Sequence, residues 1–588
     1  MRTRDILFLN LHRLNQPNPA LHGDFVGLYI MAAFLEDNGY EARVFAGGLS
    51  EGLKTISYEF GGFKVRAIGL YCDYENIDEV AEVSRFIKEK YNVPVFVGGP
   101  QSPALDQKFF QAAQCDVVVR GEGELTMLEL LGYYLNGSGD LASIKGITYL
   151  AEDGKLTIQP EQDLIQNLDA LPFVSAKHSL NSNFRNGNAA ILTGRGCPFN
   201  CAFCYEGHHT KKVRLRSVDN VISEVKSILD NHKEVKYLLF TDDTFTLDTA
   251  RIRALCEELA KLRAKHDFVW FCEAHVHTLH QHPQMLEYMV KAGLYRLQLG
   301  IEAGTDKVLS AYRKRTTAAE IKEVIKLCKE AGVTQVFGNI IVGGAHASEE
   351  VIAQDKKFIE DLLLLGEGMV ELNTVFFWPL HGTSMTKNPH EYGLKIIDSE
   401  FLTSWGDLPL AEADGLSIWR QLELRQELNE HIRSVMCNMR DKSLISEKLL
   451  RTIFNAKCKY RSGGQWVQII EEKAELYWYY NMLAQEALTD SNAFTPEALL
   501  NVRPQRMFEL FSLLKITDGQ YTIGTITLTR LHLELLRHAT GKRCLCSVLK
   551  AVYQLFEQQY TDYNEFEQDA LAALAFCEEQ HWLAYAAH

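Results

Sequence analysis

Three cysteines stand close together in this chain of 588 residues, which contains 13 cysteines in all. Cys197, Cys201 and Cys204 have the spacing C-x3-C-x2-C and follow the apolar segment AAILTG, which predicts a strand. Three thiolates on one short loop can bind three irons of a [4Fe–4S] cluster and leave the fourth iron open for a non-protein ligand. Zinc is the alternative, because a structural zinc normally takes four protein ligands and His208 and His209 follow closely.

The other cysteines are scattered along the chain and carry less information. The odd total of 13 cysteines in the chain, and the expected absence of a signal peptide, argue against a disulfide framework. Cys544 and Cys546 form a CxC pair that could bind a metal, although packing of helical thiols is the preferred interpretation.

The composition argues against several classes of protein. Asp and Glu outnumber Lys and Arg by 76 to 61, and the net charge of −15 argues against a general nucleic-acid-binding protein. No segment reaches the ~20 consecutive apolar residues of a membrane span. The apolar run near the start is too short for a signal peptide, so a first strand is expected there. We therefore expect a protein of the reducing cytoplasm that binds neither membranes nor nucleic acid.

The first 140 residues alternate short apolar runs with helix-like segments. This pattern predicts an α/β fold with a doubly wound, Rossmann-like parallel sheet. Ligands of such sheets bind at the carboxyl ends of the strands, where the turns Gly98-Gly99-Pro100 and Gly121-Glu122-Gly123 are expected. Residues 141–185 have the composition of a linker.

The rest of the chain divides into three further parts. Residues 186–400 return to strand–helix alternation with six predicted strands, which favours a partial (β/α)6 barrel. Residues 401–504 are predicted to be a helical region. Residues 505–588 combine a hairpin with three helices, so the mainly helical carboxyl-terminal region is expected to have a winged-helix-like end.

The cysteine loop resembles that of the radical S-adenosylmethionine (SAM) enzymes, whose motif is C-x3-C-x-aromatic-C. In that family SAM chelates the open iron of the cluster, and one electron cleaves it to a 5′-deoxyadenosyl radical. The resemblance implies that Cys197, Cys201 and Cys204 bind the cluster, and that Phe203 packs near the adenine of SAM.

Three motifs further along the chain support this resemblance: D-D-x-F at 242–245, G-I-E-A-G at 300–304 in place of G-I-E-S-G, and the glycine turn 343–344 after an apolar strand. They imply that Asp242, Asp243, Glu302 and Gly343 contact cofactors. Helix capping is the alternative for the two aspartates, and a surface salt bridge is the alternative for Glu302.

Two turns of the first domain resemble the G-G-P-H-x-T and G-E-G-E-x-T turns of cobalamin-binding domains fused to radical SAM domains. The turn residues thereby implied in cobalamin binding are Gly98, Gly99, Ser102, Gly121, Glu122 and Gly123. The alternative is an ordinary sheet that has lost the cofactor. The D-x-H-x-x-G motif of other cobalamin domains is incomplete around His12, so we expect no protein ligand to cobalt and place Tyr74 near the lower face of the corrin.

Together, these resemblances imply a cobalamin-dependent radical SAM enzyme. It would abstract hydrogen from an unactivated carbon and transfer the methyl group of methylcobalamin to it, on a natural product or peptide precursor. A reductant such as flavodoxin or ferredoxin is implied as well. Two alternatives remain open, namely rearrangement or cyclisation without methyl transfer, and a non-catalytic regulator that binds cobalamin and an Fe–S cluster. Candidate substrate contacts at the barrel mouth are His275, His277, Tyr312 and Arg313.

The final region resembles PqqD-like winged-helix modules, which bind leader peptides by strand addition. A structural cap on the barrel is the preferred alternative. Nucleic-acid binding is disfavoured because the last half of this region is acidic.

Overall fold

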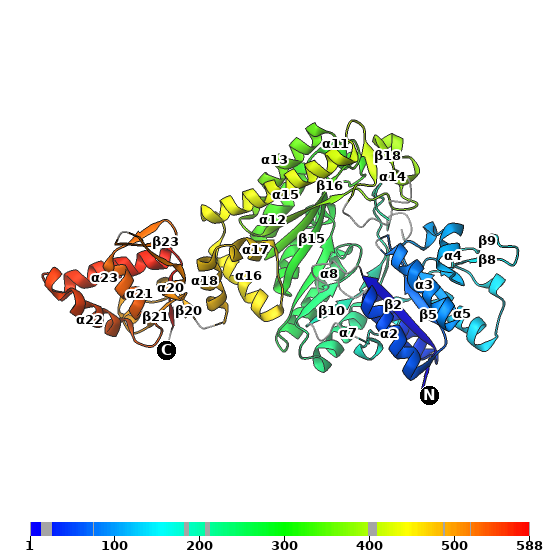
Figure 1. The fold of residues 1–588 in the computed structure, drawn as a ribbon, viewed down its shortest axis with the longest axis horizontal. Coiled ribbons are helices and arrows are strands. Elements are labelled where there is room, and N and C mark those ends of the chain that lie inside the picture. The colour runs from blue at the N-terminus through cyan, green and yellow to red at the C-terminus, as the bar shows by residue number, and fades with distance from the viewer. Residues whose placement is uncertain are drawn as a thin grey trace. The chain divides into compact units, whose positions relative to one another are not determined.

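The computed structural model describes residues 2–12, 26–74, 76–180, 187–205, 212–397, 408–485, 488–517 and 519–586. The chain divides into two compact units, Met1–Ile432 and Arg433–His588. In Figure 1 the first unit runs from blue to yellow and contains the two largest sheets, whereas the second, from yellow to red, is mostly helical. Of the helices described, none is both long and apolar enough to span a lipid bilayer.

The first sheet has seven strands in the order β3-β2-β5-β6-β7-β8-β9. In chain order these are β2 (Ile6–His12), β3 (Ala42–Gly48), β5 (Ile68–Tyr71), β6 (Val95–Gly98), β7 (Val117–Val119), β8 (Ile147–Leu150) and β9 (Leu156–Ile158). The first five strands in the sheet order are parallel, and β8 and β9 add an antiparallel edge. The short pair β1 (Arg2–Arg4) and β4 (Phe63–Val65) lies apart from this sheet.

Alternation along β2 divides its side chains between two cores. Leu7 and Leu9 join one buried cluster, whereas Ile6 and Phe8 join another. Helices α2 (Leu49–Gly62), α3 (Ile77–Tyr91) and α4 (Gln107–Ala113) supply the first cluster, and α1 (Val26–Asp37) and α5 (Glu124–Asn136) supply the second. Both faces of the sheet are covered, which confirms the predicted doubly wound fold.

The segment 141–185, which we expected to be a linker, contributes two strands to this sheet. β8 pairs with β7, and β9 pairs with β8. Ile147 of β8 is fully buried in the cluster beneath α1 and α5. The hairpin thereby covers an edge of the parallel sheet that would otherwise be open for pairing.

The second sheet has six strands, all parallel, in the order β10-β13-β14-β15-β16-β17. They are β10 (Asn188–Ile191), β13 (Tyr237–Phe240), β14 (Val269–Ala274), β15 (Leu294–Glu302), β16 (Gln335–Val342) and β17 (Val370–Phe376). The connecting helices are α7 (Val218–Asn231), α8 (Thr249–Arg263), α9 (Val276–Gln281), α10 (Gln284–Lys291), α11 (Asp306–Ala311), α12 (Ala318–Ala331) and α13 (Glu349–Gly366). Strand–helix alternation with an open sheet confirms the predicted partial barrel.

Smaller elements complete the first unit. They are the antiparallel pairs β11 (Gly194–Arg195) with β12 (Arg214–Leu215) and β18 (Leu394–Ile396) with β19 (Ala411–Ala413), and helix α14 (Ser384–Lys387). Helix α15 (Ile418–Asp441) runs across the boundary between the two units.

The second unit begins with helices α16 (Glu447–Tyr460), α17 (Gln465–Glu471), α18 (Ala474–Gln485) and α19 (Pro496–Leu499). Two small antiparallel sheets follow, β20 (Leu488–Thr489) with β25 (Leu583–Ala586) and β21 (Arg503–Arg506), and β22 (Leu514–Thr517) with β23 (Gln520–Ile523) and β24 (Ile526–Leu528). The remaining helices are α20 (Leu510–Leu513), α21 (Arg530–His538), α22 (Leu545–Phe556) and α23 (Tyr563–Glu579). The expected strands and three following helices are present, and the winged-helix assignment stays a prediction.

Candidate functional site

The cysteine loop begins directly after β11. Cys197 and Cys201 are buried and Cys204 is partly exposed, and all three pack in one cluster with Phe199. The Cys197 Sγ atom lies 3.4 Å from the hydroxyl of Thr244. Burial raises the pKa of the Cys201 thiol above its usual value, so a bound cation is needed to hold this thiol as a thiolate.

The chemistry of this donor set fits an Fe–S cluster, because three thiols share one loop and none is in a disulfide. Within the described ranges, no three Cys, His, Asp or Glu side chains already surround one point as metal ligands do. The three thiolates of a [4Fe–4S] cluster bind three different irons, so they need not surround one point. His208 and His209, the alternative zinc ligands, lie outside the described residues.

A buried ion pair lies beside this loop. The ammonium of Lys314 is 3.2 Å from Glu302 Oε1, and Lys314 is only 4% exposed. Burial lowers the pKa of Lys314, but the charges of Glu302, Cys201 and Cys204 outweigh this effect and raise it above its usual value. A permanent positive charge next to the cysteines stabilises anionic ligands there. Our sequence analysis missed Lys314, since no motif marks it.

The backbone at the end of β15 is specialised for this ion pair. A Cβ atom on Gly300 would lie 2.3 Å from Lys314 Nζ, so only glycine leaves room for the ammonium. Glu302 has a φ of 66°, a left-handed conformation that costs a residue other than glycine on the order of 1–3 kcal/mol. Such strain is concentrated at functional sites, and the buried pair excludes the surface salt bridge that was the alternative for Glu302.

The two aspartates after β13 hold the segment that leads into the cysteine loop. Asp242 accepts hydrogen bonds from both the backbone N–H (2.6 Å) and the hydroxyl of Thr193. Asp243 accepts one from the backbone N–H of Gly196 at 3.2 Å. Burial raises the pKa of Asp242 to about 6. Neither aspartate caps α8, whose N-cap is Asp248, and both hydrogen-bond to the segment before the cysteines.

Tyr312 contacts both Phe203 and the glycine turn 343–344. The Phe203 ring packs edge-on against Tyr312, with 5.1 Å between centroids. Gly343 has a φ of 75°, and a Cβ there would lie 1.9 Å from the Gln421 amide, while one on Gly344 would lie 1.8 Å from the Tyr312 hydroxyl. Close packing against Gln421 and Tyr312 thus accounts for glycine at both positions. A contact with SAM is not needed to explain them.

The candidate substrate residues all have partners within the protein. His275 stacks on Phe199 at 3.8 Å between ring centroids and accepts a hydrogen bond from the backbone N–H of His277. Burial lowers the pKa of His275 to about 2, so the ring is neutral. Tyr312 is buried, and Arg313 donates a hydrogen bond to the Ser384 hydroxyl at 3.1 Å.

The glycine turns of the first domain have the backbone that a close approach requires. Gly99 has a φ of 121°, and a Cβ there would lie 2.4 Å from the carbonyl oxygen of Cys72. Gly121 also has a positive φ, 75°. The buried Ser102 donates its hydroxyl to the Gly99 carbonyl at 2.7 Å, which closes the first turn. Gly98 ends β6, and Gly123 lies against Met31.

A cavity of about 380 Å³ lies between these turns and the cysteine loop. Its wall includes Gly99, Gly121 and Glu122 from the first domain, and Gly196, Tyr205 and Asp243 from the barrel. Arg120 also lines it, with a buried Nε that has no hydrogen-bond partner. An unsatisfied buried donor is costly, and the amide and phosphate groups of cobalamin could satisfy it, so the residues present fit this cofactor.

Tyr74 reaches the barrel from the first domain. Its ring lies 5.1 Å from the ring of Trp378, which follows β17. The Tyr74 loop, which we expected under the corrin, therefore lies near the carboxyl end of β17.

Two family models match the chain. Residues 21–131 match the B12 binding domain, and residues 191–359 match the radical SAM superfamily. The chain thus carries a B12-binding domain followed by a radical SAM domain. These matches confirm the predicted cofactors, which are a [4Fe–4S] cluster, SAM and cobalamin.

Individual relatives agree with this placement. An uncharacterized methyltransferase of Pyrococcus horikoshii is 32% identical over 53% of this chain and 66% of its own length. The anaerobic magnesium-protoporphyrin IX monomethyl ester cyclase of Rubrivivax gelatinosus is 25% identical over 56% of this chain and 61% of its own. The alignments thus span less than two thirds of either relative.

A solved structure shares the fold. The radical SAM methyltransferase TsrM of Kitasatospora setae, determined with cobalamin and a [4Fe–4S] cluster, aligns with a TM-score of 0.59 and 15% identity. The alignment covers 82% of this chain and all of TsrM (100%).

Proposed function

We propose that this protein is a cobalamin-dependent radical SAM methyltransferase that methylates an unactivated carbon of a small molecule or peptide precursor. The observation that carries this proposal is a cavity bordered both by Gly196 and Tyr205, which flank the three cysteines, and by the turns of the B12-binding domain. Both cofactors would then face one substrate position, as radical formation and methyl donation at the same carbon require. The similarity to a methyltransferase of P. horikoshii supports it.

The residues of this chain would have distinct roles in that reaction. When bound, and given one electron from a low-potential reductant, the cluster and one SAM would supply a 5′-deoxyadenosyl radical that takes a hydrogen atom from the substrate. Methylcobalamin would supply the methyl group to the resulting carbon radical, and a further electron together with a second SAM would restore it. Cys197, Cys201 and Cys204 would hold the cluster, beside the positive charge of Lys314. Asp243 fixes the Gly196 N–H, which orients the loop before the first cysteine.

The first domain would bind cobalamin against the cavity through its turns. Gly121 presents backbone without a Cβ to the cavity, whereas the Cβ position of Gly99 faces the Cys72 carbonyl and shapes the turn. Arg120 offers a buried donor in the cavity wall to an amide or phosphate acceptor. Glu122 lines the same wall, and Tyr74 would lie near the lower face of the corrin.

Labelled SAM tests the proposal once a substrate mixture is supplied. The protein is reconstituted without oxygen and given SAM with a ¹³C-methyl group and a low-potential reductant. We expect label in the substrate and release of 5′-deoxyadenosine, and loss of both in Cys201→Ala. Cys328→Ala is the matched control, because Cys328 is a buried thiol of α12 far from the cysteine loop in sequence.

Rearrangement or cyclisation without methyl transfer is the second candidate. The similarity to the Rubrivivax cyclase supports it. Deoxyadenosine release with no label in any product would favour this candidate over methylation. A regulator without catalysis would release no deoxyadenosine at all.

A further inference from the structure

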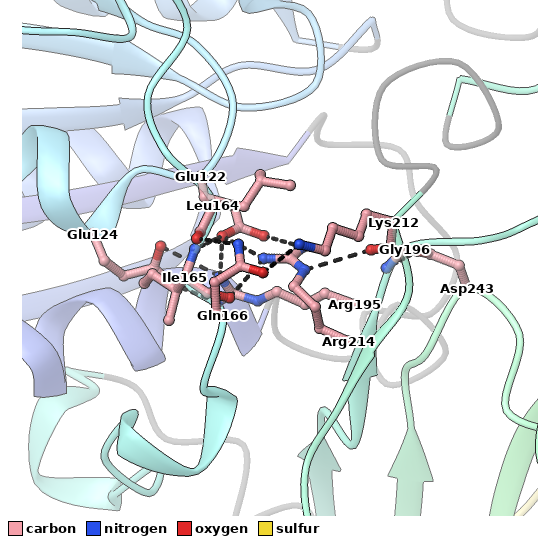
Figure 2. Close-up of polar contacts among 10 residues, drawn as sticks. All are labelled: Glu122, Glu124, Leu164, Ile165, Gln166, Arg195, Gly196, Lys212, Arg214 and Asp243. Carbon is pink, nitrogen blue, oxygen red and sulfur yellow. Dashed lines mark hydrogen bonds and ion pairs between the residues drawn. The ribbon is translucent and has the colours of Figure 1, made fainter.

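Four charged residues connect the B12-binding domain to the cysteine loop (Figure 2). Glu122 and Glu124 follow β7 of the first domain, whereas Arg195 and Arg214 lie on the paired strands β11 and β12 of the barrel. Arg214 donates two hydrogen bonds to Glu122, at 2.5 and 3.0 Å. Arg195 donates to Glu124 at 2.5 Å and lies 3.4 Å from Glu122.

The side chains of this network are largely buried. Only 3% of the Glu124 side chain and 4% of the Arg214 side chain are exposed, with 12–13% for the other two. Burial raises the pKa of Glu122, but the two arginines outweigh it and leave this pKa below its usual value. Removing one partner of such a network leaves an unpaired buried charge, so its geometry is strongly maintained.

The network is connected to the cysteine loop through the backbone, because Arg195 is two residues before Cys197. On its other side the same segment is held by Asp243, through the Gly196 N–H. On the B12-binding side, Glu122 also accepts the backbone N–H of Ile165, whose carbonyl accepts from Arg214. The loop is therefore fixed between the two domains rather than by the barrel alone.

We propose that Glu122, Glu124, Arg195 and Arg214 form an interdomain ion-pair network that sets the distance between bound cobalamin and the cluster. These are positioning residues, because they act through the loop and the turn that carry the cofactors. The proposal rests on the proposed function, in which both cofactors act on one substrate. A displacement of about 1 Å between reacting groups can cost ~10²-fold in rate, so this distance needs a rigid determinant.

Pulsed electron paramagnetic resonance tests the network directly. The full chain is loaded with cob(II)alamin and a reduced cluster, and the cobalt–cluster distance distribution is recorded. In Glu124→Gln and Arg195→Lys we expect this distribution to shift or widen while cobalamin and iron contents stay at wild-type levels. Lys145→Gln is the matched control, because its ion pair with Asp163 lies in the same domain but is largely exposed (48% and 81%). That control is expected to match the wild type.

Hydrogen exchange provides a second readout that needs neither cofactor. In both network variants we expect amides of residues 193–197 to exchange about 10-fold faster, because the loop opens locally. Unchanged distances and unchanged exchange in both variants would overturn the proposal. If the wild type itself shows no cobalt–cluster coupling, the proposed function is wrong, and the exchange rates still decide whether the network holds the loop.

Discussion

At the scale of single residues, the candidate site depends on side chains that hold other groups in place. The carboxylates of Asp242 and Asp243 accept hydrogen bonds from Thr193 and Gly196, and the expected contact of these two residues with cofactors stays a prediction. Lys314 carries no motif, yet its charge lies next to the cysteines. Motifs mark the ligands, whereas the residues that set their electrostatics are brought close only by the fold.

Gly300→Ala tests the buried ion pair. The added methyl group would lie 2.3 Å from Lys314 Nζ, so the ammonium must move away from Glu302 and the cysteines. We expect deoxyadenosine formation to fall about 10-fold, since a displacement near 1 Å is costly, and the melting temperature to fall as well, because a buried ion pair is disturbed. Activity is therefore compared at a temperature at which the variant and its control both stay folded. Gly61→Ala is the control, because nothing lies within 4 Å of a Cβ there. Equal activity of both variants would show that the pair has no role.

Cys544 is expected to be the most reactive thiol outside the cluster. Hydrogen bonds from Cys546 and Ser547 lower the pKa of Cys544 to about 7, and its Sγ lies 3.0 Å from each partner atom. An ordinary thiol with a pKa of ~8.5 is only a few per cent ionised at neutral pH. Iodoacetamide at pH 7 should therefore modify Cys544 about 10-fold faster than the exposed Cys458. Mass spectrometry of the reconstituted protein measures both rates, and equal rates would contradict the low pKa.

At the scale of elements, the alternation of apolar runs with amphipathic helical segments was sufficient to predict the two main sheets. The six barrel strands are bounded by long amphipathic helices, which leave a clear pattern. β8 and β9 were not predicted, because short antiparallel edge strands leave almost no periodic pattern in the sequence. The contact of Arg195 with Glu124 could not be predicted either, since the residues are 71 positions apart and belong to different domains.

Helix α13 is joined to the turn after β15 by Asp355, and this connection should depend on pH. Its Oδ1 accepts the Gly304 N–H at 2.6 Å, and burial raises its pKa to about 7. An unfolded Asp titrates near 3.9, so the folded state binds more protons between about pH 4 and 7. Stability therefore falls as pH rises through this window, by at most ~1.4 kcal/mol per pH unit from this group.

Asp355→Asn removes that dependence and keeps an acceptor for Gly304. We expect the free energy of unfolding of the variant to fall less steeply than that of the wild type between pH 4 and 7. Urea denaturation at several pH values measures the difference. Parallel pH profiles of the two proteins would show that Asp355 does not titrate in this window.

At the scale of the whole molecule, the arrangement places two cofactor domains around one cavity in the first unit. Sequence motifs were sufficient to assign the class of protein, because glycine turns and clustered cysteines are local features. The cavity is lined by residues that lie between positions 99 and 243 of the sequence. Neither this cavity nor the ion pair between Arg195 and Glu124 was predictable from local sequence patterns. The second unit carries none of the described cofactor residues, and the two interpretations of its end, a structural cap or a leader-peptide-binding module, stay predictions.

The most direct test of the central claim is the joint measurement of iron, bound cobalamin and 5′-deoxyadenosine in anaerobically reconstituted protein given SAM and reductant. The account predicts about four irons per chain, stoichiometric cobalamin, and deoxyadenosine formation that disappears in Cys201→Ala. A cluster without cobalamin would contradict the role of the first domain. Protein that assembles no cluster, or that cleaves no SAM, would contradict the radical mechanism itself.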